Sequence, residues 1–415
     1  MGPRRVRHIA LVGALVVGIV AVPATTGSAR PTRNTPAAPT VVHHATTKAH
    51  TLATPGLKTI ESISLTAGNW SIFAKATAID PSGGDFFRCT LVATSPTTQL
   101  DGATTSLNPT VTRDVITNIT VFKTKHAVTI QQRCGHDVDG GDAGSIDAGA
   151  SVVAFLTPAT RVRTARTTAQ TPLPNREFSG VANLSLPKGN WVVVAKVTPV
   201  DLTGSEGVDL CRLGSAPDFQ RVLGPSASGD HGVSTMVQVQ PISVSTTTTF
   251  TLECEAATDG NYLDPGSVLW AWKATHLASA TSAAPNQCPL TLSAAATSDA
   301  LVLNQQVCDV GNGSFPTEIA GAHLDAGTWV ALGAFDDLWP RDPNVVRCQL
   351  LNASKGKQFD VSSAALQYPG FSTTGITNLG VVVVPKHVDI EARCGQDGAG
   401  DPAVSAESGW GFIKP

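Results

Sequence analysis

The sequence predicts an all-β protein made of three tandem antiparallel β-sandwich domains, wired as jelly rolls or Greek keys, each with one core disulfide. The first observation behind this prediction is a motif of glycine, any residue and tryptophan, followed by an apolar run. Its copies are Gly68-Asn-Trp70, Gly189-Asn-Trp191 and Gly327-Thr-Trp329. The second observation is a composition rich in small and β-branched residues, with 38 Gly and 27 Pro, which is typical of short strands joined by turns.

The cysteines repeat with the motif. One cysteine follows each motif tryptophan by about 20 residues, and another follows that cysteine by about 45 residues, so each repeat contains one pair. Two of the eight cysteines remain, and both precede the third motif. The expected disulfides are Cys89–Cys134, Cys211–Cys254, Cys348–Cys394 and Cys288–Cys308. A pair that spans about 45 residues joins strands distant in sequence, which favours Greek-key or jelly-roll wiring over simple meanders.

The amino terminus has the features of a secretory signal at residues 1–29. Arg4, Arg5 and Arg7 form a basic start, and the apolar run that follows is too short to span a bilayer comfortably. Small residues up to Ala29 resemble a cleavage site. We therefore expect a secreted, extracellular protein without a transmembrane anchor, and an uncleaved amino-terminal anchor is the alternative. Disulfides fit that compartment.

The rest of the chain divides where strand periodicity is lost. Residues 30–57 and 158–175 are expected to be flexible linkers. The three β-sandwich repeats are expected at 58–157, 176–275 and 276–415. In each of them, alternation places apolar residues and cysteines on one face of a strand. The third repeat has an extra leader, where two strand-like runs between Cys288 and Cys308 predict a hairpin stapled by the disulfide.

Three signals recur in order within each unit. In the first unit they are Gly68-Asn-Trp70, an apolar alternation over 128–134 and a closing apolar strand over 151–156. The third unit closes with Gly409-Trp-Gly-Phe-Ile413. This order resembles the C1q/TNF-like jelly-roll family, and the Gly-x-Trp strands are also similar to repeats in secreted proteins of actinobacteria. The C1q/TNF-like resemblance implies binding or scaffolding modules, often trimeric, without catalysis.

Two tryptophans, Trp270 and Trp272, lie two residues apart in the closing strand of the second repeat, so they share one face. If exposed, they would form a stacking platform for a carbohydrate ligand. If buried, they would belong to the core or to a contact between domains, which is the interpretation we favour.

Four carboxylates on a Gly-rich loop of the first repeat form a candidate Ca²⁺ site. These residues are Asp137, Asp139, Asp142 and Asp147. Ca²⁺ prefers oxygen ligands and takes several of them, although this loop lacks the pattern of an EF-hand. Asp and Gly are also common turn residues, so an ordinary turn is the alternative. Calcium is the one cofactor that the sequence brings into consideration.

The sequence contains no Gly-x-Ser-x-Gly, His-Glu-x-x-His, P-loop or dinucleotide-binding motif. Its net charge of -3 gives no indication of nucleic-acid binding. We therefore expect a non-catalytic extracellular binding or adhesion protein, whose ligand is a glycan, a cell-wall polymer or another protein. Linked weak sites would gain avidity. The alternative is a structural or assembly protein with the repeats as spacers or oligomerising units, including homo-oligomers, and a secreted hydrolase is the least favoured.

Overall fold

The structure is a computed structural model of the chain. It describes residues 40–52, 56–80, 86–107, 112–137, 144–201, 208–214, 219–223, 232–256, 258–281, 288–293, 298–304, 308–309, 317–338, 344–366, 373–397, 403–404 and 408–415. Every regular element within these ranges is a β-strand, and Pro39–Pro415 forms one compact unit. The signal peptide expected at 1–29 lies outside the described residues. The part of the chain that is described has no helix long and apolar enough to cross a membrane.

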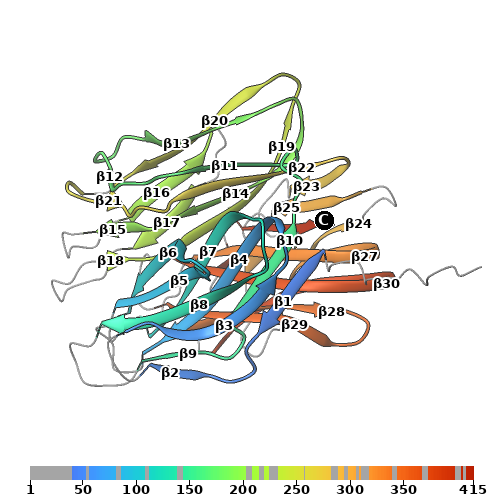
Figure 1. The fold of residues 1–415 in the computed structure, drawn as a ribbon, viewed down its shortest axis with the longest axis horizontal. Coiled ribbons are helices and arrows are strands. Elements are labelled where there is room, and N and C mark those ends of the chain that lie inside the picture. Colours follow the sequence, from blue (N-terminus) through green and yellow to red (C-terminus); the bar gives the residue numbers. More distant parts are fainter. Residues whose placement is uncertain are drawn as a thin grey trace, which may run out of the picture. The chain divides into compact units, whose positions relative to one another are not determined.

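The first repeat forms two antiparallel sheets (Figure 1). One sheet contains β1 (Val41–Ala45), β10 (Ser151–Leu156), β4 (Gly68–Ile79), β9 (Gly144–Ile146) and β2 (His50–Leu52), with β7 (Arg113–Thr124) beside β4. The other contains β3 (Lys58–Leu65), β8 (Val128–Asp137), β5 (Phe86–Thr94) and β6 (Thr97–Ser106). β5 and β8 are neighbours although β7, which lies between them in sequence, belongs to the opposite sheet. The wiring is therefore more complex than a meander, as the cysteine spacing predicted.

The second repeat contains three four-stranded antiparallel sheets. The first has β11 (Val162–Arg166), β22 (Val268–Ala274), β14 (Gly189–Val197) and β19 (Met236–Val244). The second has β13 (Ser179–Leu186), β20 (Thr248–Glu255), β16 (Val208–Leu213) and β17 (Phe219–Leu223). The third has the short strands β12 (Thr171–Pro172), β21 (Tyr262–Leu263), β15 (Pro199–Asp201) and β18 (Gly232–Val233). The Gly-x-Trp strand β14 lies between β19 and β22, as the Gly-x-Trp strand β4 of the first repeat lies between β7 and β10.

The third repeat forms one large sheet around two long strands. Its main path runs through β23 (Leu277–Thr281), β25 (Ala300–Asn304), β32 (Gly409–Ile413), β27 (Thr317–Leu338), β30 (Thr373–Asp397), β28 (Asn344–Asn352) and β29 (Lys357–Leu366). The shorter strands β24 (Leu290–Ser293), β26 (Cys308–Asp309) and β31 (Ala403–Val404) pair at its margins. The β27–β30 ladder shifts register at Glu318/Ala320 and at Asp325/Gly327. β27 continues through the second shift, so this single strand corresponds to two successive strands in each of the other repeats.

The Gly-x-Trp motif has the same structural role in each repeat. Its side chains, Trp70, Trp191 and Trp329, are fully buried. Each indole Nε1 donates a 2.9 Å hydrogen bond to a carbonyl oxygen four residues earlier, those of Thr66, Pro187 and Asp325. Gly189 and Gly327 have φ angles of 147° and 146°, which favour glycine because it has no Cβ. The motif therefore sets the turn and anchors the strand that follows.

Three of the expected disulfides are present, and each joins neighbouring strands of one sheet. They are Cys89–Cys134, Cys211–Cys254 and Cys348–Cys394, with Cα atoms 4.1, 4.1 and 4.2 Å apart. The two cysteines of each pair lie directly opposite in the strand register. Cys288 is also disulfide-bonded, whereas the side chain of its expected partner, Cys308, lies outside the described part of the structure.

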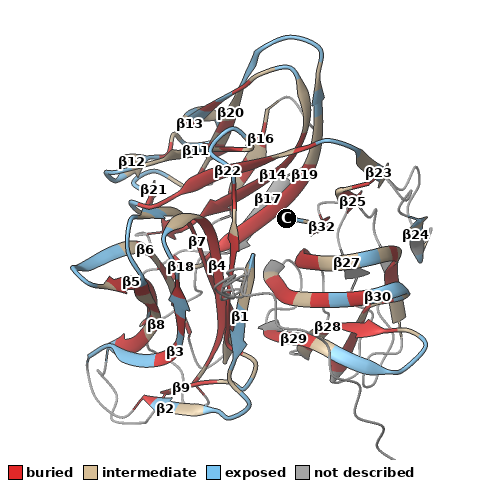
Figure 2. Cartoon of the chain, turned by 45° about the vertical axis from the view of Figure 1, so that its right-hand side comes forward, coloured by how far each residue is buried: buried red, intermediate tan, exposed pale blue. Residues whose placement is uncertain are grey.

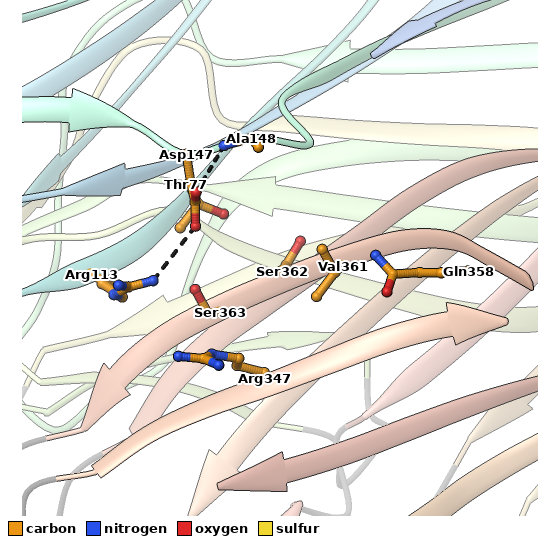
Figure 3. A pocket seen from close by; sticks show the side chains of 9 residues that line it. All are labelled: Thr77, Arg113, Asp147, Ala148, Arg347, Gln358, Val361, Ser362 and Ser363. Atoms are coloured by element: carbon orange, nitrogen blue, oxygen red, sulfur yellow. Dashed lines mark hydrogen bonds and ion pairs between the residues drawn. The ribbon is translucent and has the colours of Figure 1, made fainter. Parts of the chain in front are cut away.

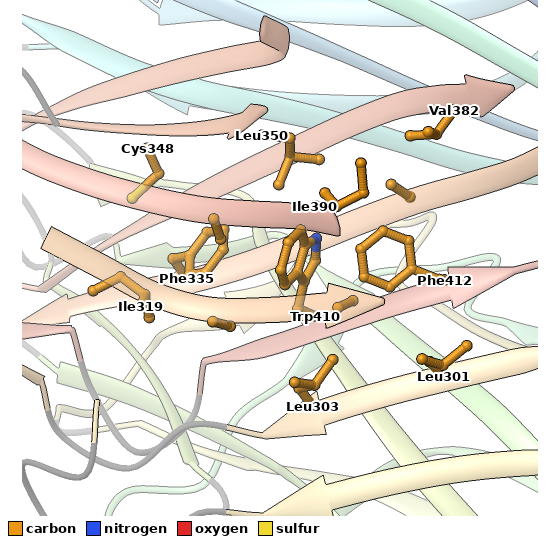
Figure 4. Close-up of a cluster of buried hydrophobic side chains, with 14 of the residues drawn as sticks. Leu301, Leu303, Ile319, Phe335, Cys348, Leu350, Val382, Ile390, Trp410 and Phe412 are labelled. Atoms are coloured by element: carbon orange, nitrogen blue, oxygen red, sulfur yellow. The ribbon is translucent and has the colours of Figure 1, made fainter. Parts of the chain in front are cut away.

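Apolar clusters fill the space within each repeat. Two clusters belong to the first repeat, one to the second with its leading segment, and one to the third. Figure 4 shows the cluster of the third repeat, where Trp410 lies between Phe335 and Phe412. The Trp410 and Phe412 ring centroids are 4.6 Å apart. These contacts give the described chain a β-sandwich-like, all-β organisation.

A further apolar cluster, which we call the shared core, draws on all three repeats. Alternate residues of the Gly-x-Trp strands divide between the two kinds of core: Trp191 and Val193 face the second repeat's own cluster, and Val192 and Val194 face the shared core. Figure 2 shows that β14 and β22 are buried along most of their length. No sheet among the described strands mixes repeats, so contacts of side chains, both apolar and polar, join the repeats.

The segments expected to be flexible linkers contain strands. β1 and β2 lie within 30–57, and β11 and β12 lie within 158–175. β1 extends the sheet beyond β10, and β11 extends the equivalent sheet beyond β22. Both additions satisfy backbone groups that an edge strand leaves unpaired. Val41 and Val162 also pack on the shared core, so these segments are ordered by sheet pairing and apolar contact.

The hairpin expected between Cys288 and Cys308 does not form among the described strands. β24 pairs in parallel with β27, and β25 pairs with β32 and β23. Each of the two strand-like runs therefore pairs with another strand of the third repeat. Leu301 and Leu303 of β25 are buried in that repeat's cluster by this pairing, which a free-standing hairpin could not achieve.

Replacement of Trp270 by Ala should weaken the contact between repeats. The indole packs edge-on against Phe73 and Phe155 of the first repeat, with ring centroids 5.0 and 6.1 Å away. We expect Trp270→Ala to lower the free energy of unfolding by about 3–5 kcal/mol, measured by denaturant titration of the oxidised protein. The exposed Val383→Ala is the control. A loss for Trp270→Ala that is no larger than the control's would contradict the shared core.

Candidate functional site

The tryptophan pair is not a ligand platform. Trp270 and Trp272 are 0% and 1% exposed, and both belong to the shared core. The indole Nε1 of Trp270 donates to Ser71 Oγ of the first repeat at 3.1 Å, and the guanidinium of Arg161 lies 5.2 Å from the centre of Trp272. A carbohydrate therefore cannot stack on these two tryptophans, because other atoms of the protein cover their indole rings. The favoured interpretation, a buried position in the core or in a contact with another repeat, agrees with this burial.

The candidate calcium loop is described only at its ends. Asp137 is exposed at the end of β8, whereas Asp139 and Asp142 lie outside the described residues. Asp147 forms an ion pair with Arg113 at 3.5 Å and accepts a 2.8 Å hydrogen bond from the Ala148 backbone N–H. Within the described ranges no group of three or more His, Cys, Asp or Glu could hold a metal ion. Calcium binding by this loop stays a prediction.

An open cleft of about 340 Å³ lies between the first and third repeats. Its polar lining includes Thr77, Arg113 and Asp147 from the first repeat and Arg347, Ser362 and Ser363 from the third. In Figure 3 the side chain of Ser363 is drawn near those of Arg113 and Arg347, and a dashed line marks the Arg113–Asp147 ion pair. We refer to this cavity as the arginine cleft.

The hydrogen-bond donors of the arginine cleft suit an anionic group. Its lining contains two guanidinium groups and several hydroxyl groups, together with the Asp147 carboxylate. Guanidinium groups bind carboxylates, phosphates and sulfates through paired, charge-assisted hydrogen bonds. The Arg113 and Asp147 side chains are 27% and 37% exposed, and ion pairs this accessible contribute little to stability. An incoming anion can therefore compete with Asp147 for Arg113.

A buried ion pair fixes one wall of the cleft. Lys75 of β4 lies 2.7 Å from Asp360 Oδ2 of β29, and both side chains are almost completely buried. Lys75 Nζ also donates to the Val361 carbonyl at 2.7 Å and to Ser362 Oγ at 2.5 Å, and both of these residues line the cleft. Burial lowers the pKa of Lys75 and raises the pKa of Asp360, although their attraction opposes both shifts.

A second buried pair joins the second repeat to the first. Lys196 occupies the same position after the motif tryptophan as Lys75, and its Nζ lies 2.9 and 2.8 Å from the two carboxylate oxygens of Asp101. Here a third charge takes part, because Arg166 Nη1 donates to Asp101 Oδ1 at 2.7 Å. Burial lowers the pKa of Lys196, the attraction of Asp101 opposes this shift, and the charge of Arg166 adds to it. In the third repeat, Ala334 stands at the equivalent position.

Each buried aspartate has an asparagine partner. Asn378 Nδ2 donates to Asp360 Oδ2 at 2.9 Å, and Asn118 Nδ2 donates to Asp101 Oδ2 at 3.4 Å. In each network the backbone N–H of the residue after the asparagine, Leu379 or Ile119, donates to the same aspartate Oδ2 atom at 2.8 Å. The sequence analysis missed these networks. The sequence does contain a lysine five residues after the motif tryptophan in two of the three repeats, but it does not show that this face of the strand is buried.

Comparisons with known proteins do not assign the chain. No protein family and no curated protein sequence matches it. One similar solved structure is titled "Life in the extremes: atomic structure of Sulfolobus Turreted Icosahedral Virus", with 10% identity over 90% of this chain and 92% of that chain and a TM-score of 0.19. Another is dimeric latent PorU from Porphyromonas gingivalis, with 8% identity over 83% of this chain and 34% of that chain and a TM-score of 0.20. TM-scores this low carry no argument about fold or function.

The buried pair between the first two repeats makes a strong prediction for stability. Lys196→Met leaves Asp101 buried with a single cationic partner, the half-buried Arg166, and should lower the free energy of unfolding by about 3–5 kcal/mol. The double variant Lys196→Met/Asp101→Leu should recover part of this loss because no uncompensated carboxylate remains buried. Denaturant titration of both proteins measures the effect. A change below about 0.5 kcal/mol for Lys196→Met would mean that the pair is unimportant for stability.

Proposed function

We propose that this protein is an exported, non-catalytic binding protein that recognises acidic groups of an extracellular polymer in the arginine cleft. The observation that carries the proposal is the pair Arg113 and Arg347, contributed by two different repeats to one open cavity. Anionic glycans and cell-wall polymers carry repeated carboxylate or phosphate groups, which suit two guanidinium groups. An open cleft can bind a group that belongs to a long chain.

We further propose that each repeat is a jelly-roll sandwich of the C1q/TNF-like kind. The repeated order of strands around β4, β14 and β27 supports this assignment. That family often acts as trimers, and here one chain would supply three modules already assembled. Secretion, predicted from residues 1–29, is consistent with three disulfides.

A structural or assembly role is the second candidate. The buried position of Trp270 and Trp272 favours it, because the aromatic pair that could have stacked on a glycan is used to join repeats. Under this alternative the protein would bind none of the polymers offered and would instead form contacts with further copies of itself. Solution mass over a range of concentrations distinguishes the two candidates.

Binding should depend on both arginines of the cleft. We expect Arg347→Gln and Arg113→Gln each to weaken binding of the mature protein to anionic polysaccharide or polyphosphate by about tenfold or more, because each removes a charge-assisted contact. Asp147→Asn should strengthen binding, since it releases Arg113 from its ion pair. Lys188→Gln, an exposed site outside the cleft, has the same charge change as the arginine variants and should bind as wild type does. Titration calorimetry in chelator measures all four.

Two outcomes would overturn the proposal. Equal weakening by Lys188→Gln would show that only net charge matters, and unchanged binding in both arginine variants would place the site elsewhere. A repeat of the wild-type titration with added Ca²⁺ tests the candidate loop at Asp137, Asp139, Asp142 and Asp147. Heat released by Ca²⁺ alone, and lost in Asp137→Asn, would support a calcium site there.

A further inference from the structure

The contact between Lys75 and Asp360 has the components of an amide-forming site. The amine and the carboxyl group come from different repeats, β4 and β29, and meet at 2.7 Å where both are almost completely buried. This position excludes water from the two groups and holds them in contact, which are the conditions under which an intramolecular condensation is favoured. Such a reaction would convert a hydrogen-bonded contact into a covalent link between the first and third repeats.

The surroundings of Asp360 are arranged to stabilise negative charge on its Oδ2 atom. Two N–H groups point at this oxygen, the side-chain amide of Asn378 at 2.9 Å and the Leu379 backbone at 2.8 Å. Attack on the carboxyl carbon places charge on such an oxygen, and preorganised N–H donors lower the barrier. Burial also moves the pKa values of Lys75 and Asp360 towards a neutral amine and a neutral acid, the forms that condense, although the attraction between the two groups opposes both shifts and the two N–H donors oppose that of Asp360.

We propose that Lys75 and Asp360 form an intramolecular amide bond that links the first and third repeats. The Nζ atom of neutral Lys75 attacks Cγ of the protonated Asp360 carboxyl group, so a C–N bond forms. The C–O bond to the acid's hydroxyl breaks, and one proton from Nζ joins that hydroxyl, so one water molecule leaves. Ser362 Oγ, 2.5 Å from Nζ, accepts a hydrogen bond from the amine and is itself fixed by its hydrogen bond to the Thr377 carbonyl at 2.6 Å, so it holds Nζ beside the carboxyl group.

The second buried pair provides an internal contrast. Lys196 and Asp101 have the same repeat positions and the same kind of asparagine partner, but Arg166 Nη1 lies 2.7 Å from Asp101 Oδ1. Lys196 Nζ also contacts both carboxylate oxygens of Asp101, at 2.9 and 2.8 Å. Two cationic groups therefore hold the oxygens of Asp101, which disfavours the departure of either oxygen as water. The Lys196–Asp101 contact therefore stays an ion pair.

Mass spectrometry of the mature, fully reduced and alkylated protein tests the proposal. We expect an intact mass lower than that of the sequence by one water molecule, no tryptic cleavage after Lys75, and a branched peptide that joins Lys75 to Asp360. Lys75→Arg should restore the sequence mass, whereas Lys196→Arg should keep the loss of water. The branched peptide is read from the wild-type protein, so the test holds even if Lys75→Arg fails to fold.

Three results would overturn the inference. The first is a wild-type mass equal to that of the sequence. The second is a loss of water that persists in Lys75→Arg, which would indicate cyclisation of an aspartate elsewhere. The third is the loss of one ammonia molecule, which would make Asn378 the electrophile. Its Oδ1 atom has no hydrogen-bond partner among the described residues, so it is the competing group that the experiment must separate from Asp360.

Discussion

The shared core is the interaction on which the rest of the structure depends. All strands of each described sheet belong to one repeat, so no backbone ladder among the described strands connects the repeats. Side chains from all three repeats must therefore bury one another. This requirement makes the Gly-x-Trp strands apolar on both faces. Any polar group on the face turned to the shared core then needs a partner, because an unpaired buried charge is very costly. Lys75 and Lys196 meet this need across the boundary between repeats.

The sequence alone was sufficient to predict the structural features that recur in each repeat. The Gly-x-Trp motif and the cysteine spacing predicted the all-β class and three disulfides that are present, because both are set within one repeat. Alternation in the strand that begins at Gly68 predicted its inner face correctly. The outer face was not predicted, since Phe73 is buried only when another repeat covers it. The strands in the expected linkers were missed for the same reason: Val41 and Val162 are ordered by a sheet edge that a single sequence does not reveal.

The arginine cleft could not be derived from the sequence, because its two guanidinium groups are more than 200 positions apart and belong to different repeats. Its geometry depends on the same packing that buries Lys75, since Val361 and Ser362 both line the cleft and accept hydrogen bonds from that lysine. The proposed binding site and the stability of the junction are therefore physically linked. A change in the junction would move one wall of the cleft, whereas a change of a cleft arginine would leave the junction in place.

Differential scanning calorimetry of the oxidised, mature protein tests the central claim most directly. If the repeats unfold together because they share a core, the trace shows one transition, and its calorimetric enthalpy equals the van't Hoff enthalpy. If the repeats are independent units joined by linkers, the trace resolves into two or three transitions, and the calorimetric enthalpy exceeds the van't Hoff value for the whole. The account predicts the first result, and the second would contradict it.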